Sequence, residues 1–157
     1  MKTDPTILIV EDNDDDYEAC YHSLSKSSSL ANPLHRCRTG DEALSYLLGT
    51  DAYANPRPAT PCLILLDLNL PGTDGRDVLH RLKIEPTLKL IPVIVMTVSD
   101  DESDLRECYS IGASGYVMKP IDIDGFFQSI ARLHNHWFKV ILQPAPNEKE
   151  DEEELDW

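Results

Sequence analysis

The stretch Leu63-Ile64-Leu65-Leu66-Asp67-Leu68-Asn69-Leu70-Pro71-Gly72 places four aliphatic residues directly before an aspartate, and a Pro-Gly turn follows. A short, unbroken apolar run closed by turn residues is typical of a strand buried on both faces of a sheet. A lone carboxylate inside such a strand would be unfavourable, so we expect Asp67 at its carboxyl end, half exposed. Ligands bind at that edge of open parallel α/β sheets. A second interpretation is that Asp67 only caps the next turn.

The composition excludes several classes of function. A chain of 157 residues with 41% apolar residues suits one globular domain. The formal net charge of -14 repels nucleic-acid phosphate and disfavours direct DNA binding. Cys20, Cys37, Cys62 and Cys108 form no CxxC pair, so we expect reduced thiols and neither a zinc site nor disulfides. We find no signal-peptide core, no membrane-length apolar run and no glycine-rich phosphate loop, and therefore expect a cytoplasmic protein.

Buried strands and amphipathic helices alternate along the chain. We expect further strands at 6–10, 34–38, 92–97 and 114–118. Helices are predicted after Asp12, after a capping box at Thr39, over 74–83, after a second capping box at Ser99, and over 126–137. The segment 49–61 holds three prolines and is predicted to be an irregular loop. Five strands that alternate with five helices predict a doubly wound, parallel α/β sheet with right-handed crossovers.

Polar residues follow four of the predicted strands where each strand ends: Glu11-Asp12, Asp67, Thr97 and Lys119. The carboxyl ends of parallel strands lie on one edge of the sheet, so we expect these side chains to gather there. Two carboxylates about 4 Å apart repel by roughly 4 kcal/mol at an effective dielectric constant near 20. The cluster therefore needs a cation or a raised pKa.

The same residue types indicate a chemistry. Carboxylates and backbone carbonyls suit a hard divalent ion such as Mg²⁺. With a metal in place, Asp67 could act as a nucleophile toward an activated phosphoryl group. The metal, Lys119 and the Thr97 hydroxyl would neutralise the transferring oxygens. The sequence therefore predicts an aspartyl-phosphate site.

Over about residues 5–140 the chain resembles the receiver domain of two-component response regulators. The likeness rests on four features, which are Ile7-Leu8-Ile9-Val10-Glu11-Asp12, the stretch from Leu65 to Gly75, Thr97, and Lys119-Pro120 with Tyr116 three residues before the lysine. The resemblance implies a flavodoxin-like fold with strand order 2-1-3-4-5 and five helices. It also implies a usually cis peptide bond before Pro120.

The resemblance assigns roles to the site residues. Asp67 would be phosphorylated, Asp12 would ligate Mg²⁺ beside it, Glu11 would help through water, and the Asn69 backbone carbonyl would be a further ligand. On phosphorylation Thr97 would move toward the phosphoryl group and Tyr116 would rotate inward. That change would repack the surface of the fourth helix, the fifth strand and the fifth helix.

A finer resemblance is to the stand-alone regulators that pair with cyanobacterial bacteriophytochromes. This resemblance rests on four segments, namely the sequence Leu-Asp-Leu-Asn-Leu-Pro, the stretch from Asp74 to Leu79, the loop 54–58 and the C-terminal stretch 136–144. It implies a sensor histidine kinase as phosphodonor, which could be light-regulated, and a homodimer through the fourth-helix to fifth-helix face. The apolar extension 137–142 could serve that dimer or pack on its own domain. We expect a receiver domain at 5–144, an acidic, disordered tail at 145–157 and no output domain.

Two other functions fit part of the pattern. A phosphatase of the haloacid-dehalogenase kind also uses a strand-end aspartate, but its DxDx[TV] pattern needs a second carboxylate where Asn69 stands. An interaction module that has lost phosphorylation is disfavoured because every expected site residue is present. A calcium-loop interpretation of 12–16 fails on its missing glycine and distal glutamate. We interpret Asp14-Asp15-Asp16 as a solvated helix start that adds negative field beside the metal.

Truncation of the chain before Asn147 tests the interpretation of the acidic tail. Because the tail contributes no core residues to the predicted fold, we expect phosphorylation by a small acyl-phosphate donor to be unchanged. Intact-mass spectrometry of the full and truncated chains makes the comparison. A large loss of labelling on truncation would show that the tail takes part.

Overall fold

A computed structural model describes residues 6–26, 32–98 and 101–119. The helix predicted at 126–137, the peptide bond before Pro120 and the acidic tail lie outside these residues. Within them, no helix is long and apolar enough to cross a membrane. The strands are β1 (Ile7–Val10), β2 (Leu34–Cys37), β3 (Leu63–Asp67), β4 (Val93–Thr97) and β5 (Gly115–Met118). The helices are α1 (Asp14–Lys26), α2 (Gly40–Leu48), α3 (Gly75–Ile84) and α4 (Glu102–Ile111), with a short 3-10 helix, η1, at Asp51–Tyr53.

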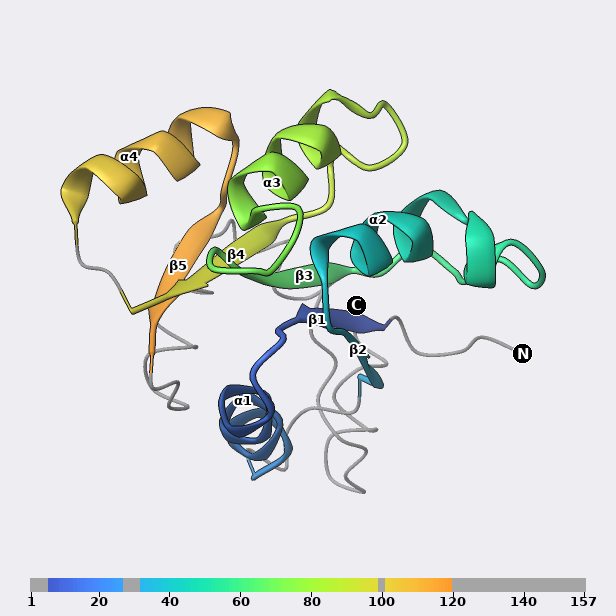
Figure 1. The fold of residues 1–157 in the computed structure, drawn as a ribbon, viewed down its shortest axis with the longest axis horizontal. Helices are drawn as coiled ribbons and strands as arrows, with labels where there is room; N and C mark the ends of the chain where they lie inside the picture. The colour runs from blue at the N-terminus through green and yellow to red at the C-terminus, as the bar shows by residue number, and fades with distance from the viewer. Residues whose placement is uncertain (1–5, 27–31, 99–100, 120–157) are drawn as a thin grey trace, which may run out of the picture.

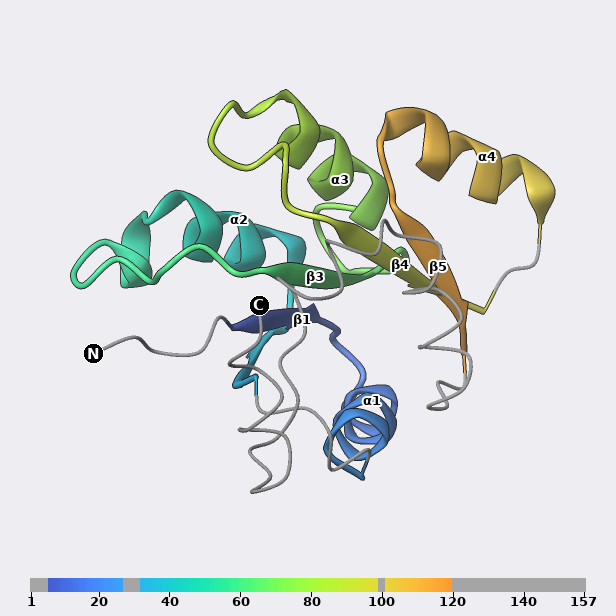
Figure 2. The ribbon, with the colours of Figure 1, turned by 180° about the vertical axis from the view of Figure 1, so that it is seen from behind.

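The five strands form one parallel sheet in the order β2-β1-β3-β4-β5. This confirms the predicted doubly wound, flavodoxin-like topology, in which the strand order reverses between β1 and β3. Figure 1 shows α1 on one face of the sheet and α2, α3 and α4 on the other, and Figure 2 shows the same layers from behind. The described residues contain four of the five predicted α-helices.

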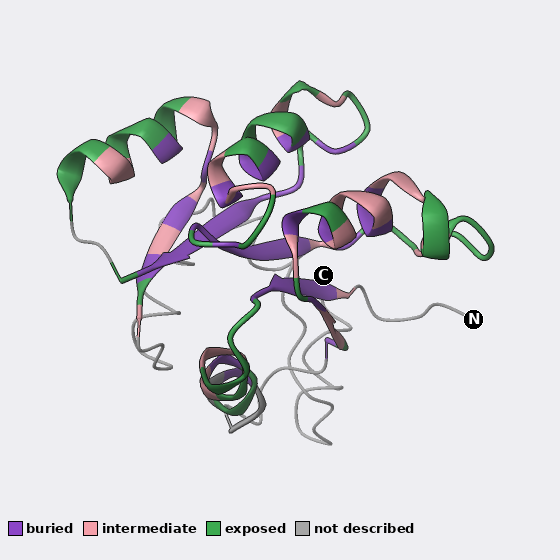
Figure 3. Cartoon of the chain, viewed as in Figure 1, coloured by how far each residue is buried: buried purple, intermediate pink, exposed green. Residues whose placement is uncertain are grey.

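The core lies on both sides of the sheet, because alternate residues of each inner strand face opposite sides. Toward α2 and α3 the strands turn one set of fully buried side chains, namely Leu8, Val10, Ile64, Leu66, Val93 and Val95. Toward α1 they turn the other set, namely Ile7, Ile9, Leu63, Leu65, Ile94 and Met96. Figure 3 shows the inner strands β1, β3 and β4 buried, the edge strands β2 and β5 partly so, and the helices buried only on their sheet-facing sides. Each such aliphatic side chain contributes about 1.5–3 kcal/mol on burial.

Side-chain caps fix where the helices begin. The Thr39 hydroxyl accepts the Glu42 N–H at 3.0 Å, as the predicted capping box requires. Its return bond differs, since the Glu42 carboxylate accepts the Arg38 N–H at 2.9 Å. The prediction of a cap at Ser99 is wrong, because α4 begins after Asp101, whose side chain accepts the Ser103 N–H at 2.8 Å. Serine and aspartate are both favoured at the N-cap, so residue type alone did not distinguish Ser99 from Asp101, which directly precedes the helix.

The segment 49–61 is more ordered than the predicted irregular loop. It contains η1, whose Tyr53 packs edge-on against His35 and Tyr46, with ring centroids 5.9 and 5.0 Å away. The Tyr53 hydroxyl also donates to the Glu42 carboxylate at 2.8 Å. The aromatic contacts therefore tie this long connection to β2 and α2, which its proline content did not indicate.

Helix α4 is held to the rest of the fold chiefly through α3. Of its residues only Cys108 is buried. Arg76, in the first turn of α3, reaches across to α4 and forms ion pairs with Asp104 at 3.0 Å and Glu107 at 3.5 Å. The packing of α4 thus depends on polar contacts more than that of α2 or α3, which bury several aliphatic side chains each.

Gly75, at the start of α3, provides a test of this packing. An added Cβ would lie 2.3 Å from the Asp67 carbonyl oxygen and 2.7 Å from Leu68 Cα, both of them backbone atoms. Helix propensity alone would make Gly75→Ala stabilising, whereas the overlap predicts destabilisation by about 1–3 kcal/mol. Urea unfolding measures the sign. His80→Ala, at an exposed position of the same helix, is the control and should change little, and a stabilised Gly75→Ala would contradict this packing.

Candidate functional site

The backbone brings the predicted site residues to one edge of the sheet. Glu11 directly follows β1 and donates its N–H to the Cys37 carbonyl of β2 at 3.0 Å. Asp67 ends β3, where it pairs in register with Met96 of β4. Lys119 follows β5 and donates its N–H to the carbonyl of Thr97, the last residue of β4, at 2.9 Å. The carboxyl ends of four strands therefore meet at this edge, as parallel pairing requires.

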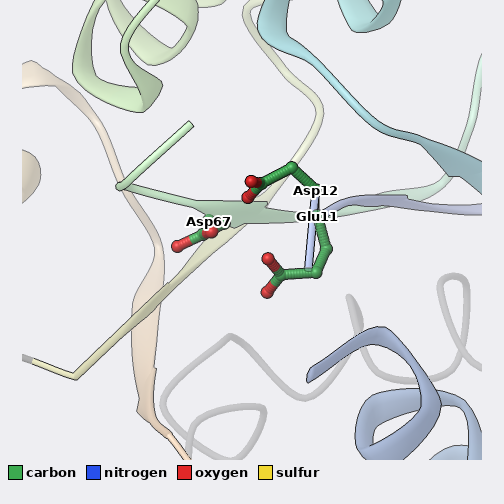
Figure 4. Close-up of side chains that lie close together, drawn as sticks. All are labelled: Glu11, Asp12 and Asp67. Carbon is green, nitrogen blue, oxygen red and sulfur yellow. The ribbon is translucent and has the colours of Figure 1, made fainter. Parts of the chain in front are cut away.

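Glu11, Asp12 and Asp67 form a compact carboxylate cluster. One oxygen from each lies within 4.8 Å of the others, and Figure 4 shows the three carboxyl groups turned to the same side. Asp12 is exposed, whereas Glu11 and Asp67 are 1% and 2% exposed. The expectation that Asp67 is half exposed is therefore wrong. Its buried charge is compensated by Lys119 Nζ at 3.3 Å from Oδ2 and by the Asn69 N–H, which donates to Oδ1 at 3.1 Å.

Lys119 is the cation of the site. Its side chain is 8% exposed, and Nζ contacts Glu11 Oε1 at 2.6 Å, Asp16 Oδ2 at 3.0 Å and Asp67 Oδ2 at 3.3 Å. Burial lowers the pKa of Lys119, but the contacts with these three carboxylates outweigh it and raise the pKa above the usual lysine value. The ammonium is therefore charged at any physiological pH, and it bridges the ends of β1, β3 and β5 with the start of α1.

Glu11 carries the unfavourable part of this arrangement. Burial raises the pKa of Glu11 to about 7, and the nearby Asp67 carboxylate acts in the same direction, while Lys119 opposes both. The Asn13 N–H donates to Glu11 Oε2 at 3.2 Å and gives partial compensation. Crowded acids of this kind are the electrostatic situation that a divalent cation relieves.

The remaining predicted residues lie around the cluster. Thr97 is buried, at 2% exposure, and Asn69 lies on the exposed loop after β3. Tyr116, in β5, is partly buried, and its ring lies edge-on to that of Tyr109 on α4, with centroids 6.3 Å apart. The structure thus joins Lys119 directly to the carboxylate cluster and places Tyr116 toward α4.

The contacts of two residues at this edge, Arg36 and Asp16, were not predicted from the sequence. Arg36 of β2 donates from Nε to the Glu11 carbonyl at 3.0 Å, pairs with Asp14 at 2.9 Å and lies over the Tyr17 ring. It thereby holds the turn between β1 and α1. Asp16, interpreted as part of a solvated run, instead contacts Lys119. Asp14 and Asp15 share its place in the first turn of α1, so the sequence holds no signal that singles out Asp16.

The cysteines take no part in this chemistry. All four are free, and Cys20, Cys37 and Cys108 are buried while Cys62 is partly exposed. Burial raises the pKa of Cys20 and Cys37 to about 12 and that of Cys62 to about 11. Thiols that stay protonated at neutral pH are poor nucleophiles and poor metal ligands.

Comparison with known proteins identifies the family of the chain. The profile of the response regulator receiver domain matches residues 7–131, which is more than half of the chain. The chain belongs to the response regulator receiver domain family. Receiver domains are phosphoacceptor regulators that take their phosphoryl group from sensor histidine kinases and bind Mg²⁺ at an acidic pocket.

The relatives of this receiver domain include phytochrome-associated regulators. The response regulator Rcp1 of Synechocystis sp. is 37% identical over 140 residues, which are 88% of this chain and 92% of Rcp1. The Mn²⁺-bound structure of Rcp1 superposes with a TM-score of 0.71 over 90% of this chain and 99% of that one, at 35% identity. The bacteriophytochrome response regulator AtBRR is 40% identical, with a TM-score of 0.77 over 84% of this chain and 94% of that one. The phosphorylated cyanobacterial phytochrome response regulator RcpA is 36% identical, with a TM-score of 0.72 over 87% and 96%.

The side chains present fit a hard divalent ion. The carboxylate cluster offers only oxygen donors, as Mg²⁺ and Mn²⁺ prefer, and one of its members, Asp12, is exposed to solvent. No other group of three acidic, histidine or cysteine side chains with this spacing occurs in the ranges that the structure covers.

Mg²⁺ should stabilise the folded receiver domain. A Mg²⁺ concentration about ten times the dissociation constant contributes about 1.4 kcal/mol, which thermal unfolding with and without the ion detects. Asp12→Asn should remove most of this effect, since the variant loses one carboxylate of the cluster. Asp15→Asn removes the same charge three residues away and should retain the effect. An equal Mg²⁺ response in Asp12→Asn would place the binding site elsewhere.

Proposed function

We propose that Asp67 accepts a phosphoryl group from the phosphohistidine of a sensor histidine kinase, with Mg²⁺ as cofactor, and that phosphorylation switches a protein-docking surface. The observation that carries this proposal is the pairing of the buried Asp67 carboxylate with Lys119 at the edge where the carboxylate cluster lies. Family membership supports the same reaction, since receiver domains are phosphoacceptors.

In the transfer, an Asp67 carboxylate oxygen attacks phosphorus, the phosphorus–nitrogen bond of the donor breaks, and its imidazole nitrogen keeps the electron pair. Lys119 donates to the transferring phosphoryl oxygens, because its Nζ already lies 3.3 Å from Asp67 Oδ2. Glu11, Asp12, Asp67 and the Asn69 backbone carbonyl would hold Mg²⁺. When bound there, the ion would supply positive charge that offsets the negative charge of the phosphoryl oxygens.

The switch in this proposal runs from the site to α4. Thr97, at the end of β4, moves its hydroxyl toward the phosphoryl group, and Tyr116 turns inward from its place beside Tyr109. The exposed side chains Val98, Tyr109 and Met118 lie on this part of the molecule, at 65%, 39% and 37% exposure. Exposed apolar side chains on elements that adjoin Thr97 and Tyr116 support protein docking at this part of the molecule.

We further infer a phytochrome-type kinase as the phosphodonor and a homodimer as the assembly. The first rests on the likeness to AtBRR, a bacteriophytochrome response regulator, and to RcpA, a cyanobacterial phytochrome response regulator. The proposed homodimer would use the α4 side of the molecule together with the predicted fifth helix, which lies outside the described residues. Neither inference alters the chemistry at Asp67.

We infer that the chain is a signalling phosphoacceptor and not an enzyme that turns over a substrate. A haloacid-dehalogenase phosphatase would need a second carboxylate where Asn69 stands. The two functions differ in stoichiometry, because a receiver domain takes up about one phosphoryl group per chain and releases it slowly. Steady hydrolysis of a phosphate ester over many cycles would favour the phosphatase.

Asp67→Asn tests the phosphoacceptor directly. After incubation with acetyl phosphate and Mg²⁺, we expect intact-mass spectrometry to show one added phosphoryl group on the unaltered chain and none on the variant, since the amide is not a nucleophile. The variant should remain folded, because the Asn side-chain oxygen can still accept the Asn69 N–H.

Asp77→Asn is the matched control, because it removes the same charge from an exposed position of α3. It should be labelled like the unaltered chain. Persistent labelling of Asp67→Asn would assign the phosphoryl group to another residue. Absence of labelling in every variant, with and without Mg²⁺, would favour an interaction module that has lost phosphorylation.

A further inference from the structure

Asp16 contacts Lys119 but has no part in the proposed phosphoryl transfer. Its Oδ2 lies 3.0 Å from Nζ, which is closer than Asp67 Oδ2 at 3.3 Å. Its side chain is 39% exposed, so its charge remains solvated and costs little to keep at the rim of the site. A contact to the cation of the site that serves neither the metal nor the phosphoryl group calls for a physical explanation.

Asp16 is fixed relative to Glu11 through a shared neighbour. The Asn13 side chain caps α1 and accepts the Asp16 N–H at 2.9 Å. The Asn13 N–H in turn donates to Glu11 Oε2 at 3.2 Å. The turn between β1 and α1 therefore presents Glu11 and Asp16 to Lys119 as a pair whose spacing is set by one residue.

The geometry of an ammonium group makes this pair useful. Lys119 has three N–H donors in a tetrahedral arrangement on a flexible stem of four carbons. A single carboxylate partner would leave the group free to turn about that one contact. Nζ donates a hydrogen bond to Asp16 Oδ2 at 3.0 Å and forms ion-pair contacts with Glu11 Oε1 at 2.6 Å and Asp67 Oδ2 at 3.3 Å, so Asp16 restricts the positions that the ammonium can take beside the other two carboxylates.

We propose that Asp16 is a positioning residue that aims the Lys119 ammonium at Asp67 and at the phosphoryl group transferred to it. The inference rests on the proposed function. When the phosphoryl group is attached to Asp67, its oxygens take the place of Oδ2 beside the ammonium, while Glu11 and Asp16 keep their contacts with Nζ. The ammonium therefore does not need to reorganise during the reaction.

The alternative explanation is that Asp14, Asp15 and Asp16 act only as a diffuse negative field. Asp14 is engaged elsewhere, with Arg36 at 2.9 Å and Arg38 at 2.8 Å, and Asp15 is exposed. A diffuse field repels an anionic phosphodonor, so removal of any of these charges would raise the labelling rate. Positioning predicts the opposite sign for Asp16 alone.

Labelling kinetics with acetyl phosphate at saturating Mg²⁺ separate the two explanations. We expect Asp16→Ala to lower the maximal labelling rate by about three- to tenfold with little change in the half-saturating donor concentration. Asp15→Ala, the matched control, should stay within about twofold of the unaltered chain, because a solvated charge at this distance has a weak effect. Asp16→Glu keeps a carboxylate within reach of Lys119 and should restore most of the lost rate.

Each outcome decides the inference. An Asp16→Ala rate equal to or above that of the unaltered chain would overturn it and leave the proposed function intact. An equal loss in Asp15→Ala, or no recovery in Asp16→Glu, would also overturn it. No labelling of the unaltered chain would overturn the proposed function and this inference with it. Matched thermal midpoints check that the variants are folded, and Asp16→Asn replaces Asp16→Ala if the alanine variant does not fold.

Discussion

The ion pairing of the buried Lys119 ammonium with the carboxylates of Glu11, Asp16 and Asp67 holds together the edge of the sheet at which the candidate site lies. Without Lys119, the carboxylates of Glu11 and Asp67 would lie close together at 1% and 2% exposure and would lose the cation that contacts both, which is strongly unfavourable. The strand order makes the pairing possible, because the parallel register brings the ends of β1, β3 and β5 to the same edge. The fold and the site therefore depend on each other. The sheet positions the charged side chains, and these compensate one another's charge at the end of the core.

Some residues around this edge hold the backbone in place, and others orient the side chains of the site. Arg36 fixes the turn after β1 through the Glu11 carbonyl, and Gly75 lets α3 begin in contact with the end of β3. Asn13 connects the Glu11 carboxylate with Asp16 through two hydrogen bonds. Such a site is largely preorganised, since these donors and acceptors are engaged before any ligand binds.

The apolar runs and the strand-end polar residues were enough to predict the sheet, its direction and the gathering of Asp67 and Lys119 at one edge. Burial of Asp67 was not predictable from its own strand, because its compensation comes from a lysine far along the chain. The cap of α4 was misplaced because serine and aspartate are both favoured at the N-cap, and the spacing of Ser99 to Glu102 also matches a capping box. The contact of Asp16 was missed for a related reason, since a run of three aspartates does not show which one turns toward the sheet.

The attachment of α4 has a consequence for the solution behaviour of the protein. This helix buries one side chain, Cys108, packs partly exposed Ile111 on the core and Tyr109 on Tyr116, and is also tied to α3 by the Arg76 ion pairs, whose partners are partly exposed. Partly exposed ion pairs are screened by dissolved salt, whereas aliphatic packing of the kind that holds α2 and α3 is not. The attachment of α4 is therefore more sensitive to ionic strength than that of α2 or α3, and amide hydrogen exchange at low and high salt would reveal faster opening of α4 than of these two helices.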